Sequence, residues 1–290
     1  MSNTNIAQAT LRGNRKINQD RFISIEGEGS ILLGLADGMG GHPKGEVAAQ
    51  ILIDTCKSFF HRTDKPIHSP REFLHRLLQK AHENVTAFGL EHDPPIKPRT
   101  TAVVALIQEG VARWAHAGDS RLYLFRNGKT LQRTADHSYV QHLEDHGMIS
   151  HDKMMTHPQR NYVTRCLGGN ITSPEITVSK AARLKEGDAI MLCSDGLWSK
   201  TDEIQMAKAF CSDTPLAQTL DDAVKNAAET AAPSSDNVTA IALRWHMEKP
   251  KAAKPIQPKK EQQQDPVQDE VTQALDELKS AIESFENDKK

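Results

Sequence analysis

Five aspartates stand at the ends or starts of short apolar runs, where their carboxylates can gather. They close the runs ILLGLAD and AIMLCSD, follow ARWAHAG, open DRFISI and precede NVTAIAL. If these runs are antiparallel strands, the end of one strand and the start of the next share an edge, so all five side chains can meet at one rim. The five residues are Asp20, Asp37, Asp119, Asp195 and Asp236.

Such a set of carboxylates predicts a site for divalent metal ions. Carboxylates that gather in a partly buried place repel one another, and a bound cation removes that cost. Oxygen ligands without a cluster of His or Cys favour Mg²⁺ or Mn²⁺ over Zn²⁺. Each aspartate alone is more simply a turn or cap residue. Together, beside five apolar runs, they indicate an acidic metal site suited to phosphoryl chemistry.

The composition predicts one globular domain with an appendage. The chain has 290 residues, of which 38% are hydrophobic and 26% charged, and its formal net charge is −2. This balance gives no electrostatic signature for nucleic acid or for a membrane surface. We find no signal-peptide pattern and no apolar run long enough to span a membrane. We therefore expect a cytoplasmic chain whose four cysteines, at 56, 166, 193 and 211, are reduced.

The strands and helices that must position the aspartates follow one another in an irregular order. Strands are expected at 6–12, 20–26, 30–37, 100–108, 111–117, 121–126, 175–179, 188–194 and 237–246. Helices are expected at 44–61, 69–90, 137–147, 202–211 and 216–230, and the stretch 151–170 reads as irregular. This order is not a regular βαβ alternation, so it favours antiparallel sheets covered by helices over a doubly wound parallel sheet.

The character of the chain changes after Met247. Residues 248–265 are rich in Lys, Pro and Gln, which is typical of a flexible linker. Residues 266–290 predict an amphipathic helix. Its apolar stripe comprises Val271, Ala274, Leu275, Leu278, Ala281, Ile282 and Phe285. Three roles stay open for this helix: docking on its own domain, binding a protein partner, or acting as a self-inhibitory segment.

Eight short motifs resemble, in order, the motif series of the PPM (type 2C) protein phosphatases in their bacterial branch. They are RGNRKINQD at 12–20, ADGMGGH at 36–42, AGDSR at 117–121, ADHS at 135–138, HPQRN at 157–161, TRCLGG at 164–169, LCSDGLW at 192–198 and SDNVT at 235–239. The resemblance runs from about residue 6 to residue 246. It implies an α+β fold, a four-layer α-β-β-α sandwich of two antiparallel sheets flanked by helices. It further implies a catalytic domain at 1–247 that hydrolyses phosphoserine and phosphothreonine in proteins.

The resemblance also assigns roles to individual residues. Asp37 should bridge two metal ions, and the backbone carbonyl of Gly38 should bind one of them. The first ion should be held by Asp195 and Asp236, and the second approached by Asp20 through water. A third, weaker site is implied for Asp119 together with Asp195. Arg15 should bind the substrate phosphate, for which its planar guanidinium is suited.

Two Mn²⁺ or Mg²⁺ ions lower the pKa of a bridging water, so that hydroxide can attack phosphorus directly without a covalent phosphoenzyme. Many eukaryotic relatives carry a His directly after the Asp-Gly pair, assigned as the general acid. Here that position is Met39. The leaving alkoxide is therefore protonated by a metal-bound water or by another group, among which His42 is a weaker candidate.

Several competing interpretations deserve weighing. The sequence Cys56 to Arg62 satisfies the Cys-x5-Arg pattern of tyrosine phosphatases, but its cysteine fits the buried stripe of a helix. The glycine-rich stretch 38–45 matches neither nucleotide-binding fingerprint. The main alternative is a metal-poor pseudophosphatase that binds phosphoproteins as a scaffold. Such a protein usually lacks a metal-binding aspartate, whereas all five are present here. The expected substrates are proteins phosphorylated by a Ser/Thr kinase.

Five histidines crowd the region 137–157, and the stretch 145–165 matches the family's flap beside the active site. We expect them to be exposed to solvent rather than to form a metal site, and we hypothesise that they tune substrate access with pH. The five are His137, His142, His146, His151 and His157.

Overall fold

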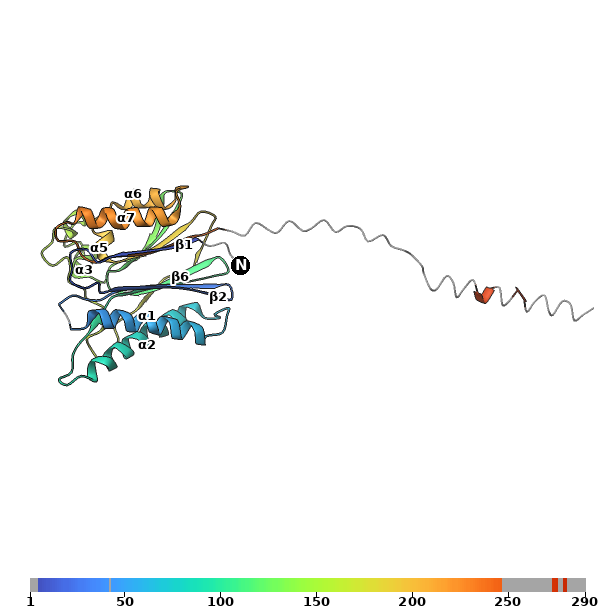
Figure 1. Cartoon of the computed structure of the whole chain (residues 1–290), viewed down its shortest axis with the longest axis horizontal. Helices are drawn as coiled ribbons and strands as arrows, with labels where there is room; N and C mark the ends of the chain where they lie inside the picture. The colour runs from blue at the N-terminus through green and yellow to red at the C-terminus, as the bar shows by residue number, and fades with distance from the viewer. Residues whose placement is uncertain (1–4, 42, 247–272, 276–278, 281–290) are drawn as a thin grey trace, which may run out of the picture. The chain divides into compact units, whose positions relative to one another are not determined.

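Two antiparallel sheets stack face to face at the centre of the first of two units in the chain (Figure 1). The structure, a computed structural model, describes residues 5–41, 43–246, 273–275 and 279–280. The chain divides into units at Met1–Glu248 and Lys249–Lys290. One sheet has the order β1 (Asn5–Leu11), β13 (Val238–Arg244), β12 (Ala189–Cys193), β7 (Arg121–Arg126) and β8 (Lys129–Arg133). The other has the order β10 (Thr177–Val178), β6 (Val111–Ala117), β5 (Ala102–Gln108), β3 (Ser30–Asp37) and β2 (Asp20–Gly27).

Helices cover the outer face of each sheet (Figure 1). The β2-containing sheet is covered by α1 (Gly45–Arg62) and α2 (Pro70–Leu90), and the β1-containing sheet by α6 (Glu203–Phe210) and α7 (Leu216–Thr230). Short elements complete the unit: β4 (Arg99–Thr100), β9 (Leu167–Gly168), β11 (Ala182–Arg183), α3 (Tyr139–Asp145), α4 (His151–Met154) and α5 (Asp195–Trp198). The order of layers is therefore helices, sheet, sheet, helices, which confirms the expected four-layer α+β sandwich.

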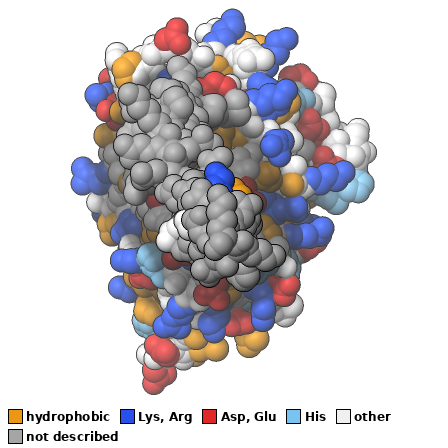
Figure 2. All heavy atoms as spheres, turned by 90° about the vertical axis from the view of Figure 1, so that its right-hand side faces the viewer, with side chains coloured by type: hydrophobic (Ala, Val, Ile, Leu, Met, Phe, Trp, Pro, Cys, Tyr) orange, Lys and Arg blue, Asp and Glu red, His pale blue; other side chains and the backbone are white. Residues whose placement is uncertain are grey.

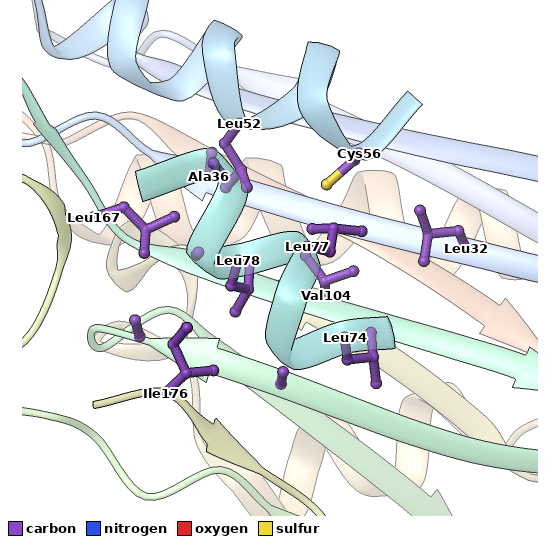
Figure 3. Packing of buried hydrophobic residues seen from close by; sticks show 14 of the residues in the cluster. Leu32, Ala36, Leu52, Cys56, Leu74, Leu77, Leu78, Val104, Leu167 and Ile176 are labelled. Carbon is purple, nitrogen blue, oxygen red and sulfur yellow. The ribbon is translucent and has the colours of Figure 1, made fainter. Parts of the chain in front are cut away.

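The sandwich buries both faces of its central strands. In β3, Leu33 and Leu35 point into the cluster between the sheets, while Leu32 and Ala36 point toward the helices. This alternation follows from the period of two in a strand. Figure 3 shows Ala36 next to Leu52 of α1, with Cys56 of α1 and the leucines of α2 in the same cluster as Leu32. A strand buried on both faces reads as a continuous apolar run, which is why β3, β5 and β12 were predictable.

Short and polar elements escaped the sequence analysis. Strand β8, of sequence KTLQR, lies at a sheet edge and is mostly exposed, so it carries no apolar periodicity. The stretch 151–170, expected to be irregular, contains α4 and β9. The strand expected at 175–179 shrinks to the two residues of β10. Elements of two to four residues are held by tertiary contacts rather than by a local pattern, so the sequence carries little signal for them.

Most of the region after Met247 lies outside the described residues, including the whole predicted linker at 248–265. Of the predicted helix at 266–290, residues 273–275 and 279–280 are described, and they are helical. The predicted boundaries of linker and helix stay predictions. Within the described ranges, no helix combines the length and the apolar character needed to cross a membrane.

Candidate metal centre

The five aspartates lie where strands of the two sheets begin or end. Asp20 begins β2 and pairs in register with Asp37, the last residue of β3. Asp195 begins α5 directly after β12, and Asp236 shortly precedes β13, the antiparallel neighbour of β12. Asp119 lies in the turn between β6 and β7. The charges of the other four all raise the pKa of Asp37, so the structure brings the whole set together.

Burial and nearby charges raise the pKa values of four of these carboxyls. The pKa of Asp37 lies well above its ordinary value, chiefly because of burial and then because of Asp20 and Asp195. Burial is also the main cause that raises the pKa of Asp20 to about 6. It raises the pKa of Asp119 to about 7 and that of Asp195 to about 8. Carboxyls with such pKa values resist ionisation until a cation compensates their charge.

The donor set fits hard divalent cations. Oδ1 of Asp20 is buried and has no hydrogen-bond partner in the described part of the chain, so it is free to bind an ion or its water. Among the described residues, no three His, Cys, Asp or Glu side chains are grouped closely enough to hold one ion on their own. Mg²⁺ needs no such group, because it is usually bound by one or two carboxylates and keeps several waters. An all-oxygen set also disfavours Zn²⁺.

Arg15 lies at this centre and is paired with one of its carboxylates. Its Nη2 donates to Oδ2 of Asp236 at 2.6 Å, and the two side chains are 55% and 36% exposed. The charges of Asp236, Asp195 and Asp37 all raise the pKa of Arg15. Ion pairs this exposed are usually worth about 0–1 kcal/mol. The guanidinium can therefore exchange Asp236 for another oxyanion at little cost.

Two amide side chains clamp the loop that carries Arg15. Oδ1 of Asn14 accepts from the backbone N–H of Ser235 at 3.2 Å and from its hydroxyl at 2.8 Å. Oδ1 of Asn237 accepts from the backbone N–H of Gln19 at 2.8 Å, and its Nδ2 donates to the carbonyl of Arg12 at 2.8 Å. The bonds fix the loop 12–19 against the entry to β13. The sequence analysis gave these residues no role, although both lie within the motifs.

Hydroxyl groups hold the backbone of Asp37. The hydroxyl of Thr100 donates to the carbonyl of Asp37 at 3.0 Å, and the N–H of Asp37 donates to the hydroxyl of Thr101 at 3.0 Å. Thr101 in turn shares a hydrogen bond of 2.7 Å with Ser120. Across the sandwich, the hydroxyl of Ser194 donates to Oδ2 of Asp20 at 2.9 Å. Sequence reasoning gave these hydroxyls no role, although Thr100, Thr101 and Ser194 lie in predicted strands and Ser120 lies in the motif at 117–121.

Gly38 follows β3 at a point of very close packing. Its N–H donates to the carbonyl of Gln19 at 3.2 Å, and a Cβ at this position would lie 2.4 Å from the carbonyl oxygen of Gly45. Only glycine therefore fits here. The next residue, Met39, donates its N–H to the carbonyl of Arg99 at 3.0 Å. His42, the weaker candidate for the general acid, lies outside the described residues.

The backbone of Asp119 is held by an indole. Nε1 of Trp198 donates to the carbonyl of Asp119 at 2.9 Å. The guanidinium carbon of Arg121 lies 3.5 Å from the centre of the same indole ring. Arg121 also donates to both carboxylate oxygens of Asp136, each at 2.8 Å. Trp198 and the Arg121–Asp136 pair therefore fix the turn that presents the Asp119 carboxylate.

A pocket of about 410 Å³ opens beside the centre. Its volume suits a phosphorylated side chain. The carboxylates of Asp119, Asp195 and Asp236 line it together with Arg15. The stretch 154–161, α5 and the residues just after α5 supply further lining residues: Met154, Met155, Arg160, Asn161, Trp198 and Lys200.

Burial decides two expectations about residues outside the metal centre, Cys56 and His137. Cys56 is fully buried, and burial raises the pKa of its thiol to about 12, which excludes it as a nucleophile. All four cysteines are free, as expected. The expectation of an exposed His137 is wrong, because its ring stacks on His116 at 4.4 Å and its Nδ1 accepts from the N–H of Gly118. Burial lowers the pKa of His137 to about 3.

The other four histidines of that group are less buried. Three are exposed and one, His157, is half-buried. Within the described residues, the five do not form a group that could hold a metal ion. The hypothesis that they tune substrate access with pH now concerns His146, His151 and His157 and stays a prediction. Replacing these three together should change the pH profile of peptide hydrolysis, and an unchanged profile would remove the hypothesis.

Comparison with known proteins gives similarities over most of the chain. The model of the family described as Protein phosphatase 2C matches residues 8–236. The serine/threonine protein phosphatase PstP of Mycobacterium tuberculosis is 37% identical over 172 residues, which are 58% of this chain and 32% of that protein. The chain thus spans about a third of the length of that relative. Protein phosphatase PhpP of Streptococcus pneumoniae is 28% identical over 247 residues, which cover 84% of this chain and 98% of PhpP.

Solved structures show the same architecture. The serine/threonine phosphatase of S. agalactiae superposes with a TM-score of 0.76 at 26% identity, over 84% of this chain and 100% of that one. The catalytic domain of PstP in complex with 2 manganese ions superposes with a TM-score of 0.70 at 28% identity, over 84% of this chain and 99% of that one.

Proposed function

The chain belongs to the protein phosphatase 2C family, and on this premise we propose that it is a metal-dependent protein phosphatase that hydrolyses phosphoserine and phosphothreonine esters. The observation that carries the proposal is the cluster of five buried or half-buried carboxylates beside Arg15 and a pocket. Relatives that match this chain carry the name serine/threonine protein phosphatase. The substrates we propose are phosphoproteins that a Ser/Thr kinase modifies.

The proposed metal ligands are those that the motifs suggested. Asp37 would serve both ions and the carbonyl of Gly38 one of them, with Asp195 and Asp236 on the first and Asp20 near the second through water. Asp119 would serve a third, weaker site with Asp195. The related PstP domain in complex with 2 manganese ions supports a count of two and the choice of Mn²⁺ or Mg²⁺. Such ions, when bound, lower the pKa of coordinated water and neutralise charge on phosphoryl oxygens.

The chain's own residues would bind and orient the ester. Arg15 would leave Asp236 and grip two phosphate oxygens with its planar fork. The clamp on its loop keeps the guanidinium at the pocket, so little ordering is required when substrate arrives. In the part of the chain that the structure describes, no histidine lines this pocket, and Met39 carries no exchangeable side-chain proton. The described residues therefore offer no imidazole as the general acid.

The alternative of a pseudophosphatase is disfavoured by the site. A protein that only bound phosphoproteins would not need carboxylates such as Asp20, Asp37 and Asp195, whose pKa values are raised by burial and by one another's charges. The arrangement costs stability unless cations are bound. A direct test measures phosphate release from a phosphothreonine peptide by the full chain, with Mn²⁺ and with EDTA. Release that requires Mn²⁺ supports the enzyme, and no release in either condition would leave the scaffold as the better hypothesis.

Replacing Arg15 with Ala should raise KM for a phosphopeptide by about 10- to 100-fold, because charge-assisted hydrogen bonds to phosphate are worth roughly 1.5–3 kcal/mol. Arg15→Lys keeps the charge but loses the fork, so its KM should be intermediate. The matched control is Arg71→Ala, which removes an exposed arginine of α2 that is not part of the pocket lining. Steady-state kinetics on one phosphopeptide measure all four proteins. An unchanged KM in Arg15→Ala would give that residue another role.

We further propose that residues 1–247 form an autonomous catalytic domain in the cytoplasm and that the helix at 266–290 binds a protein partner. Removing residues 248–290 should leave thermal unfolding and the hydrolysis of p-nitrophenyl phosphate within about 20% of the full chain, since stability away from a packed core changes little. Calorimetry and a colorimetric assay measure this. Aggregation of the truncated chain would instead assign the tail to the core.

A further inference from the structure

The pocket beside the metal centre carries four cationic side chains, and two of them are already neutralised. Arg15 pairs with Asp236 at 2.6 Å, and Arg121 pairs with both oxygens of Asp136 at 2.8 Å each. Arg121 is also 8% exposed and covered by the indole of Trp198, so it is closed to a ligand. The remaining two cations of the lining are Arg160 and Lys200.

Neither Arg160 nor Lys200 forms an ion pair with any acidic residue of the described ranges. Nη1 of Arg160 donates to the carbonyl of Met155 at 3.1 Å, which orients the guanidinium and leaves its other N–H groups available. Lys200 follows α5, and its backbone N–H is bound by the carbonyl of Leu197 at 3.1 Å. Both side chains belong to exposed residues, so an anion can reach them from solvent.

The acidic members of the lining do not compete for these two cations. Asp136 and Asp236 are paired with arginines, and Asp119 and Asp195 belong to the proposed metal centre. The pocket lining therefore keeps two positive charges, at Arg160 and Lys200, without an ionic partner among the described residues. On the face shown in Figure 2, Lys and Arg lie interspersed with Asp and Glu. The formal net charge of the chain is −2, so the two unpaired cations in this pocket do not reflect a general excess of positive charge.

Resting on the proposed phosphatase activity, we infer that Arg160 and Lys200 form a second anion subsite, which selects substrates carrying another negative group near the phosphorylated residue. The group is a carboxylate of Asp or Glu or a second phosphate in the same peptide. Arg160 comes from the stretch 154–161 and Lys200 from the end of α5, so an anion held between them also fixes that stretch over the pocket. A guanidinium and an ammonium both bind carboxylate and phosphate, and the guanidinium favours the planar or bidentate acceptor.

The apolar part of the lining limits where this second group can lie. Met154, Met155 and Val140 line the pocket together with Trp198 and offer no donor to a phosphate. Asn161 and Ser199 of the lining add uncharged polar groups, so a negative group on the substrate finds its unpaired cationic donors at Arg160 and Lys200. Substrates with a neutral or basic neighbour gain nothing there, and a lysine neighbour meets two like charges.

The test compares three peptides of equal length with one phosphothreonine: flanked by alanines, flanked by glutamates, and carrying a second phosphothreonine. The full chain with Mn²⁺ should hydrolyse the acidic or doubly phosphorylated peptide with a kcat/KM about fivefold or more above that of the alanine peptide, since partly exposed ion pairs contribute up to about 1 kcal/mol each. The preference should reside in KM and shrink between 50 and 500 mM NaCl, because salt screens exposed charges.

Variants then assign the preference to the subsite. Arg160→Ala and Lys200→Ala should each reduce the ratio between acidic and alanine peptides, and Lys200→Glu should lower it below the Lys200→Ala value. Lys129→Ala and Arg71→Ala, which remove equivalent charges from exposed positions outside the pocket lining, should keep the ratio of the wild type.

The outcomes separate the two proposals. If the wild type hydrolyses none of the peptides, the phosphatase function itself fails. If it hydrolyses all three equally, or if the preference survives in the double variant Arg160→Ala/Lys200→Ala, the subsite is wrong while the phosphatase function stands. A preference confined to the second phosphate, or one confined to glutamate, supports the subsite and identifies its anion.

Discussion

Replacing Asp37 with Asn should abolish metal-dependent phosphatase activity and at the same time stabilise the metal-free protein. Activity should fall by more than about 100-fold, because even residues behind the ligands of a metal typically contribute 10–100-fold to affinity or activity. The stability gain follows from burial and from the neighbouring carboxylates, which raise the pKa of Asp37 well above its ordinary value. A neutral amide of the same shape removes that repulsion. Phosphopeptide turnover with Mn²⁺ and thermal unfolding in EDTA at pH 8 measure the two effects.

Asp221→Asn is the matched control, since Asp221 is exposed on α7 and lines no part of the pocket. It should leave both turnover and unfolding temperature unchanged. Asp195→Asn should behave like Asp37→Asn, because burial and the charges of Asp119 and Asp236 raise the pKa of Asp195 to about 8. Near-wild-type turnover in Asp37→Asn would falsify the assignment of the site. Lost turnover together with lower stability in EDTA would instead give Asp37 a structural role.

The sequence predicts a site residue where that residue ends a long apolar run, and not where it lies in a loop without periodicity. Asp37 and Asp195 end apolar runs of β3 and β12 that are buried on both faces, so the strands and their ends could be located. The antiparallel order then placed the carboxylates at one rim. The pairing of Arg15 with Asp236 could not be predicted, because the two lie 221 residues apart and meet through a loop without periodicity.

The residues that hold the aspartates escaped prediction for a related reason. Thr101 and Ser194 act through single hydroxyls whose partners come from other strands. His137 was expected to be exposed like the histidines that follow it, yet its ring accepts a hydrogen bond from the N–H of Gly118. A hydrogen bond across the fold leaves no pattern in the local sequence, whereas burial of a whole strand does. The chemistry of the site was therefore readable, and its supporting network was not.

Without metal, the stability of the chain should fall as the pH rises from about 6.5 to 8.5. The pKa of Asp119 is raised to about 7 and that of Asp195 to about 8, chiefly by burial. Between the ordinary carboxyl value and these raised values, the folded state binds more protons than the unfolded state, so the free energy of unfolding decreases with pH. Below pH 6.5 the buried histidines 82, 116 and 137, whose pKa values are lowered by burial, act in the opposite direction. Between pH 6.5 and 8.5 the change in stability therefore reports on the carboxyl groups of Asp119 and Asp195.

Mn²⁺ should cancel this loss, because the ions bind the ionised carboxylates and compete with protons for them. At about 100 times its dissociation constant, a ligand stabilises by roughly 2.7 kcal/mol. For a domain of this size that is a rise of about 5–10 °C in unfolding temperature. The rise should be clearly larger at pH 8.5 than at pH 6.5, and Asp37→Asn should show little of it. A rise of equal size at both pH values would mean that the ions bind somewhere other than these carboxylates. That result would count against the metal centre even if the enzyme proved active, because a site whose ligands resist ionisation must bind its metal more weakly as protons are added.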